Sequence, residues 1–156
     1  GGYFSDLSAE DNLNAVGEIL IKDIKKRKLK IEELISKFEL DAVRKVEAKF
    51  LSGGMKRRLV ISMSLLGEPE ILLMDEPLAA LDPQTIQMLQ TIIIKLQSEY
   101  NLTILITDHQ ARDLLVVCDR AVILSNSKIV AEGTPNQLMQ NDNAAKYYFG
   151  DNFKFK

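Results

Sequence analysis

Apolar and polar positions in the first part of the chain, residues 1–66, follow the period of amphipathic helices. Ser8 and Asp11 have the spacing of a capping box, and the apolar side chains after them recur every three or four positions, at Leu13, Val16, Ile19, Leu20 and Ile24. This pattern predicts one helix over residues 8–27. The polar stretch 41–50 predicts a turn and a short helix. Before it, a second helix is indicated by four apolar positions, Ile31, Leu34, Ile35 and Phe38.

From residue 67 onward, short apolar runs alternate with helical periods. The runs 71–74 and 102–107 predict strands that are buried on both faces. Asp82 and Pro83, a helix cap and a favoured first residue, begin the helical period between the two runs. Its apolar positions are Ile86, Leu89, Ile92, Ile93 and Leu96. A strand, a helix and a strand in this order predict a right-handed crossover and a parallel pair of strands.

The pattern after residue 107 predicts smaller elements. Residues 111–117 indicate a helix, and residues 121–125 and 128–132 indicate two strands joined by a turn at Asn126-Ser127. Gly133-Thr134-Pro135 then begins the carboxyl-terminal helices, which lead into a tail with five aromatic residues. The chain is thus predicted to have three parts, a helical part at residues 1–66, an α/β part at 67–134 and carboxyl-terminal helices with an aromatic tail at 135–156.

Composition excludes several classes of protein. The 156 residues are 46% hydrophobic and 27% charged, a balance typical of globular rather than disordered chains. Lysine and arginine number 20 and aspartate and glutamate 22, so the net charge of −2 argues against nucleic acid as a partner. Cys118 is the one cysteine, which excludes an internal disulfide and favours the cytosol. No apolar run reaches the roughly 18–20 residues of a membrane helix, so we expect contact with a membrane only through partners.

A helix start with bare backbone N–H groups is predicted at Leu51-Ser52-Gly53-Gly54. The first turn of a helix carries about half a positive charge, and glycine lets a phosphate approach the free N–H groups without a side-chain clash. The segment therefore suits an anion. Serine followed by two glycines is also common in ordinary turns, which is the alternative interpretation.

Two acids, Asp75 and Glu76, follow directly after the first apolar run, at the strand end where open parallel sheets bind ligands. A carboxylate at Asp75 is suited to hold Mg²⁺ through water. Glu76 is placed to polarise a water for attack on a phosphoryl group. The alternative is that both acids cap the next turn, but the apolar run before them favours the functional interpretation.

His109, the sole histidine, occupies the matching place after the second strand. We expect its imidazole and the Glu76 carboxylate to converge on one ligand at neighbouring strand ends; the alternative is a structural histidine. Asp82 is a candidate both for a functional contact and for the cap of its helix, and the two roles are compatible. The basic run 25–30 is interpreted as the solvated face of a helix rather than as a phosphate site.

Together these segments resemble the ATP-binding cassette ATPases. In order and spacing, residues 51–54 are similar to the signature motif, residues 71–77 to Walker B, Ala80-Leu81-Asp82 to the D-loop and His109 to the switch histidine. The resemblance implies ATP and Mg²⁺ as ligands and a homodimer with a second ATPase subunit. It further implies a role for each matching residue: Asp75 positions Mg²⁺, Glu76 is the general base, His109 contacts the γ-phosphate, Asp82 lies at the dimer interface, and Ser52, Gly53 and Gly54 contact the γ-phosphate of ATP held by the opposite subunit.

One motif of the family is absent from these residues. A cassette holds the phosphates in a Gly-x-x-x-x-Gly-Lys-Ser/Thr loop, and no glycine of this chain precedes a lysine. We therefore expect the chain to be the carboxyl-terminal part of a cassette, an ATPase in the intact parent that hydrolyses nothing alone. The implied fold class is α/β, a partial P-loop NTPase (RecA-like) parallel sheet with an ABC-type helical subdomain, lacking the N-terminal P-loop strands.

Within the family, the chain resembles the ATPases of lipopolysaccharide export, through residues 107–113, 117–121, 131–135 and 148–153. Branched-chain amino-acid import ATPases share much of this pattern, so import is the alternative. The resemblance implies transmembrane subunits as partners and a place on the cytoplasmic face of the inner membrane. Tyr3 and Phe4 are candidates for the wall that grips these subunits, although Ser5-Asp6 stands where a basic residue is expected.

Two other classes are alternatives. ATPase halves of chromosome maintenance and DNA repair also combine a signature with Walker B and no P-loop. They predict sustained heptads before Leu51 and a basic surface, and the sequence has neither. A dimerisation module without catalysis predicts loss of the acids, whereas Asp75 and Glu76 are both present.

Overall fold

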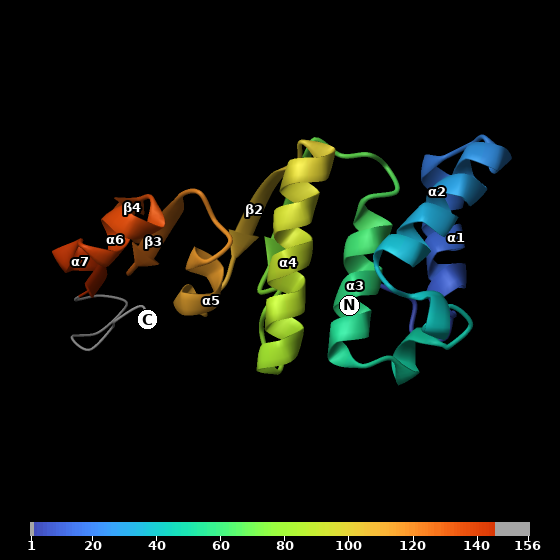
Figure 1. Cartoon of the computed structure of the whole chain (residues 1–156), viewed down its shortest axis with the longest axis horizontal. Helices are drawn as coiled ribbons and strands as arrows, with labels where there is room; N and C mark the ends of the chain where they lie inside the picture. The colour runs from blue at the N-terminus through green and yellow to red at the C-terminus, as the bar shows by residue number, and fades with distance from the viewer. Residues whose placement is uncertain (1, 146–156) are drawn as a thin grey trace.

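Three helices form one end of the molecule in the computed structural model, which describes residues 2–145 (Figure 1). They are α1 (Ala9–Leu20), α2 (Ile24–Lys37) and α3 (Gly53–Ser64). Two single turns of 3-10 helix, Asp41–Val43 and Ala48–Phe50, lie between α2 and α3, which confirms the turn and short helix predicted there. The buried side chains of this end include Leu13, Leu34, Ile35, Phe38 and Leu59.

The prediction of one helix over residues 8–27 is wrong, because the chain leaves the helix after Leu20 and a new helix begins at Ile24. Asp23 explains the break. Its carboxylate accepts hydrogen bonds from the backbone N–H groups of Lys25 (2.8 Å) and Lys26 (3.0 Å), so it caps α2. An aspartate that satisfies the first amides of a new helix competes with continuation of the old one.

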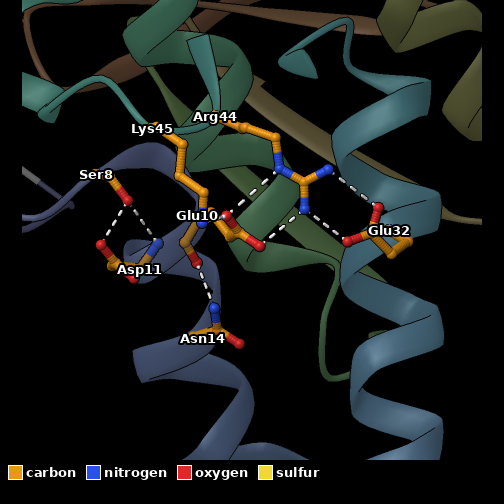
Figure 2. Close-up of polar contacts among 7 residues, drawn as sticks. All are labelled: Ser8, Glu10, Asp11, Asn14, Glu32, Arg44 and Lys45. Atoms are coloured by element: carbon orange, nitrogen blue, oxygen red, sulfur yellow. Dashed lines mark hydrogen bonds and ion pairs between the residues drawn. The ribbon is translucent and has the colours of Figure 1, made fainter. Parts of the chain in front are cut away.

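A cluster of charged side chains joins α1 and α2 through the segment that follows them (Figure 2). The Arg44 guanidinium lies 2.8 Å from the Glu10 carboxylate and 2.6 Å from that of Glu32. Lys45 also pairs with Glu10. Hydrogen bonds from Arg44 and then Lys45 lower the pKa of Glu10 to about 2. The cluster therefore links α1 and α2 electrostatically through Arg44.

The second part of the molecule is a strand, helix and strand crossover formed by β1 (Ile71–Asp75), α4 (Pro83–Tyr100) and β2 (Thr103–Thr107). The two strands pair in parallel, in a register that runs from Ile71 opposite Thr103 to Asp75 opposite Thr107. Asp82 caps α4 by accepting a hydrogen bond from the Thr85 N–H at 3.0 Å. Figure 1 shows α4 lying along β2 between the three helices and the carboxyl-terminal end.

The prediction that β1 and β2 are buried on both faces is wrong for the described residues. Leu72 and Met74 are buried in the same core as the apolar face of α4. Ile71, Leu73 and Leu105 are 60%, 70% and 60% exposed. Alternation of this kind follows from the pleat of a strand, which points successive side chains to opposite faces, and within residues 2–145 only one face of this sheet is covered.

The third part contains α5 (Ala111–Leu115), the antiparallel pair β3 (Ala121–Ser125) and β4 (Lys128–Gly133), α6 (Pro135–Met139) and α7 (Asp142–Ala144). Asn126 and Ser127 make the predicted turn with φ values of 49° and 60°. Five buried residues form a separate small core, Leu115, Ile123, Ala131, Leu138 and Ala144. The predicted aromatic tail, Tyr147 to Phe155, lies outside the described residues. No helix within residues 2–145 is both long enough and apolar enough to span a membrane.

Candidate functional site

The carboxyl ends of β1 and β2 bring Asp75, Glu76 and Thr107 together. Asp75 and Thr107 are register partners, and the Thr107 hydroxyl donates a hydrogen bond to the Asp75 carboxylate. The next residue, Glu76, donates its backbone N–H to the Thr107 carbonyl at 2.7 Å. Parallel pairing is the cause of this proximity, because it places both strand ends at one edge of the sheet.

Glu76 and His109 face one another across this edge. The Glu76 carboxylate oxygen Oε1 lies 3.4 Å from Nδ1 of His109. Both side chains are exposed, at 57% for Glu76 and 67% for His109, so a ligand has access to them. Glu76 has a φ of 46°, in the left-handed region that non-glycine residues seldom adopt. Backbone strain of this kind clusters at functional sites.

Asp108 and Gln110, which flank His109, hold the turn that follows Glu76. The Asp108 side chain is completely buried, and its carboxylate accepts hydrogen bonds from the Leu78 N–H (3.0 Å) and the Gln110 N–H (2.9 Å). The Gln110 amide donates to the Leu78 carbonyl at 2.9 Å. Both backbone groups of Leu78 are thus bonded to neighbours of the histidine. In the sequence Asp108 and Gln110 contribute only to the resemblance over residues 107–113, and no role is predicted for them. The signal for Asp108 was an acid directly before the histidine at a strand end.

The segment 51–54 forms the predicted helix start. Ser52 caps α3, and its hydroxyl accepts a hydrogen bond from the Met55 N–H at 3.2 Å. Packing leaves little room for a side chain at either glycine, whether or not a ligand binds there. A Cβ added at Gly54 meets the Thr85 methyl at 2.7 Å, and one at Gly53 meets a Leu81 methyl at 3.3 Å. The signature-like helix start therefore packs directly against the segment that contains Asp82.

Asp82 occupies the capping position predicted for it. Besides the Thr85 N–H, its carboxylate accepts a hydrogen bond from the Thr85 hydroxyl at 2.6 Å. This hydroxyl bond, followed by the backbone bond, lowers the pKa of Asp82. Thr85 thus uses its methyl group against Gly54 and its hydroxyl for Asp82, which links the start of α3 to the start of α4.

The site residues fall into two groups that lie on either side of one arginine. Asp75, Glu76 and His109 form the group at the strand ends, and Ser52, Gly53, Gly54 and Asp82 form the group at the helix starts. Arg57 of α3 donates a hydrogen bond from Nη2 to the Glu76 backbone carbonyl at 2.7 Å and so joins the two groups. In the sequence Arg57 is only one of several cationic residues one turn after the glycines, and no contact with Glu76 is predicted for it.

The group at the strand ends offers few ligands for a divalent cation. Within residues 2–145 no set of three His, Cys, Asp or Glu side chains is arranged to enclose a metal ion. Asp75 offers one exposed carboxylate, with the Thr107 hydroxyl beside it. Mg²⁺ is commonly bound through one or two carboxylates, its own waters and substrate phosphates rather than by a protein cage, so this donor set suits Mg²⁺ that arrives with a phosphate ligand.

Comparisons with known proteins identify the relatives of this chain. The sequence model of a family described as "ABC transporter" matches residues 2–79. The lipopolysaccharide export system ATP-binding protein LptB of Haemophilus influenzae is 40% identical over 153 residues, which are 97% of this chain and 63% of that protein. The LptB protein of Escherichia coli K12 is 36% identical over 154 residues, with the same two coverages of 97% and 63%. The chain thus spans less than two thirds of the length of these relatives.

Solved structures show the fold. The structure of cbiO1 from Clostridium perfringens, described as part of the ABC transporter complex cbiONQ, superposes with a TM-score of 0.81 at 22% identity, covering 92% of this chain and 57% of that one. The ADP conformation of MJ1267, an ATP-binding cassette, gives a TM-score of 0.77 at 21% identity, covering 94% and 64%. The predicted fold class is thereby confirmed: the α/β arrangement is a partial P-loop NTPase fold with a helical subdomain.

Proposed function

The chain belongs to the ABC transporter family, and from this premise we propose that it is part of an ATP-hydrolysing transporter subunit that drives lipopolysaccharide export. The observation that carries the proposal is the 3.4 Å approach of the Glu76 carboxylate to the His109 imidazole, at the end of a strand whose last residue is the exposed Asp75. The identity of 36–40% to LptB proteins supports lipopolysaccharide as the transported class.

In the proposed reaction, Glu76 accepts a proton from the attacking water and His109 donates a hydrogen bond to the γ-phosphate. Positioning and charge stabilisation account for most of the rate in phosphoryl transfer, and the 3.4 Å separation of the two side chains would let both reach one phosphate group. Asp75 would hold Mg²⁺, which neutralises charge that develops on the phosphate oxygens.

Ser52, Gly53 and Gly54 are proposed to act on the ATP of a second copy. The start of α3, which Ser52 caps, would offer its first backbone N–H groups to an anion, and a phosphate enclosed from two sides meets more donors than one face supplies. Asp82, adjacent to this helix start, would then lie in the same interface. The proposed assembly is a homodimer on the cytoplasmic face of the inner membrane, bound there by transmembrane subunits.

The 156 residues are proposed to be inactive alone, because they contain no Gly-Lys pair and hence no P-loop to hold the β- and γ-phosphates. ATP hydrolysis measured on these residues and on the full-length protein that contains them tests this. We expect turnover in the full-length protein only. ATP hydrolysis by residues 1–156 alone would contradict the proposal that hydrolysis needs a P-loop from outside these residues. Absence of hydrolysis by the full-length protein with its transmembrane subunits would contradict the proposed function.

Affinity capture separates export from import. The full-length protein, tagged and extracted with its membrane partners in mild detergent, is expected to retain transmembrane subunits that bind lipopolysaccharide. Recovery of amino-acid permease subunits instead would favour the import ATPase that the sequence left as an alternative. A matched sample with both Tyr3 and Phe4, the candidate wall residues, changed to Ala is expected to recover less of either partner.

A further inference from the structure

We propose that Arg57 is a positioning residue that holds Glu76 in place for hydrolysis. Arg57 is on α3, one turn after the glycines, and its Nη2 donates a hydrogen bond to the Glu76 carbonyl at 2.7 Å. The inference rests on the proposed function, because it assigns Arg57 a task in the reaction attributed to Glu76. The guanidinium acts on the backbone of Glu76 and leaves its carboxylate free.

Within residues 2–145, hydrogen bonds to three different segments hold the backbone of Glu76. Its N–H donates to the Thr107 carbonyl of β2 at 2.7 Å, and its carbonyl accepts from the Ala79 N–H at 3.2 Å as well as from Arg57. These bonds stabilise a φ of 46°, a conformation that is strained for a residue with a side chain. The bond from Arg57 is charge-assisted and therefore the strongest type of the three.

The backbone conformation of Glu76 determines where its side chain points. A peptide that rotates about φ or ψ moves the carboxylate away from His109, which it now faces at 3.4 Å. Displacement of a catalytic group by about 1 Å can cost on the order of a hundredfold in rate. Removal of Arg57 is therefore expected to slow the chemical step while the phosphate contacts, and with them the binding of ATP, stay largely as they are.

The surroundings of Arg57 argue against a purely structural role. Within residues 2–145 no carboxylate lies at ion-pair distance from its guanidinium, whereas the next residue, Arg58, pairs with Glu39 at 2.8 Å. The Arg57 charge is thus directed at a single carbonyl oxygen. Among the residues that the structure describes, Arg57 uses one N–H for this bond. Lysine can make a single bond of this kind, which is not true of sites that need both arms of the guanidinium.

The proposal is tested in the full-length protein with Arg57→Ala, Arg57→Lys and a control, Arg120→Ala. Arg120 is an exposed arginine that pairs with Glu132 on the distant β3–β4 hairpin. For Arg57→Ala we expect kcat for ATP hydrolysis to fall by about ten- to a hundredfold and KM for ATP to change by less than about threefold. Arg57→Lys should recover at least half of the lost activity on a logarithmic scale, and Arg120→Ala should behave as the wild type.

A second measurement needs no nucleotide and so separates this proposal from the proposed function. Amide hydrogen exchange over residues 76–79 is expected to accelerate in Arg57→Ala, because the Ala79 N–H is bonded to the same carbonyl. Unchanged exchange would overturn the contact, and accelerated exchange with unchanged kcat would overturn its role in positioning. A rise in KM alone would instead make Arg57 a nucleotide-binding residue. If exchange is faster in Arg57→Ala but the wild type hydrolyses no ATP, the proposed function is rejected and the contact of Arg57 with the Glu76 carbonyl is upheld.

Discussion

The Glu76 carboxylate lies 3.4 Å from Nδ1 of His109, although 32 residues, including the whole of α4, lie between them in the chain. Glu76 follows β1 and His109 follows β2. The parallel register of β1 and β2 produces this approach, since Asp75 and Thr107 are partners at the strand ends. Two residues that follow paired strand ends must lie close together. The proposed base and the proposed hydrogen-bond donor thereby lie beside one another.

The imidazole of His109 is expected to contribute through a hydrogen bond to the γ-phosphate. For His109→Ala in the full-length protein, kcat should fall by about a hundredfold or more, the usual range for loss of a group that stabilises developing charge. His109→Gln should retain part of the activity, because its amide can still donate to a phosphate oxygen. Steady-state ATP hydrolysis with both variants measures this. Equal activity of His109→Ala and wild type would remove His109 from the site.

Gly54 is expected to tolerate no side chain, because an added Cβ would lie 2.7 Å from the Thr85 methyl. Gly54→Ala should destabilise the fold by about 1–3 kcal/mol through overpacking. Thr85→Ser removes that methyl and keeps the hydroxyl that bonds Asp82, so the double variant should regain most of the loss. Urea unfolding of the four proteins completes a double-mutant cycle. Additive losses would show that the contact with Thr85 is not the cause.

Asp82 combines a cap with a proposed interface contact, and two substitutions separate these roles. Asp82→Asn keeps a capping oxygen and should leave the free energy of unfolding nearly unchanged, whereas Asp82→Ala should lower it by about 1 kcal/mol. Any loss of ATPase activity or of ATP-dependent dimerisation in Asp82→Asn then reports the charge at the interface. If Asp82→Asn keeps full activity and dimerisation, the interface role is rejected and only the cap remains.

Glu10 is expected to make the stability of the helical part depend on pH. Its pKa is lowered from 4.5 to about 2 in the folded chain by Arg44 and Lys45. A lowered pKa in the folded state stabilises the fold above pH 4.5, and this contribution disappears as the pH falls from 4.5 towards 2. Lys45 and Glu32 in this cluster are largely exposed, so water screens the ion pairs. We therefore expect ionised Glu10 to contribute about 1–2 kcal/mol to the free energy of unfolding, less than the pKa shift alone implies.

Glu10→Gln should therefore unfold at lower urea concentration than the wild type at pH 7, and the difference should shrink steadily below pH 4.5. Glu18→Gln is the matched control on the same helix, since the Glu18 carboxylate is exposed and 3.7 Å from Arg27. Unfolding midpoints measured between pH 2.5 and pH 7 provide the test. A difference between Glu10→Gln and wild type that does not vary with pH would contradict the ionic origin of the effect.

The strand, helix and strand crossover could be predicted because its signals are local. Asp82-Pro83 begins α4, and apolar runs mark both strands. The break between α1 and α2 was missed because the apolar period continues through it, while one aspartate, Asp23, decides the boundary. The exposure of Leu73 and Leu105 could not be predicted either. An apolar strand sequence does not reveal which faces of the strand are covered by the rest of the described chain.

The approach of Glu76 to His109 followed from strand ends in a parallel sheet, so sequence reasoning could anticipate it. Arg57, Asp108 and Gln110 could not be found in the same way. Each contacts a backbone N–H or carbonyl, 19 to 32 positions away, and backbone groups leave no pattern in the sequence. Residues that hold the main chain around the candidate site therefore emerge only when the fold is known.

The most direct test of the proposed hydrolysis is a comparison of Glu76→Gln with wild type in the full-length protein, with ATP and Mg²⁺ present. Glutamine keeps the size of the side chain and cannot accept the proton, so turnover should fall by at least about a hundredfold. ATP should still bind, and the protein should accumulate as a nucleotide-bound dimer in size-exclusion chromatography. Hydrolysis at the wild-type rate, with no accumulated dimer, would contradict the assignment of Glu76 as the base.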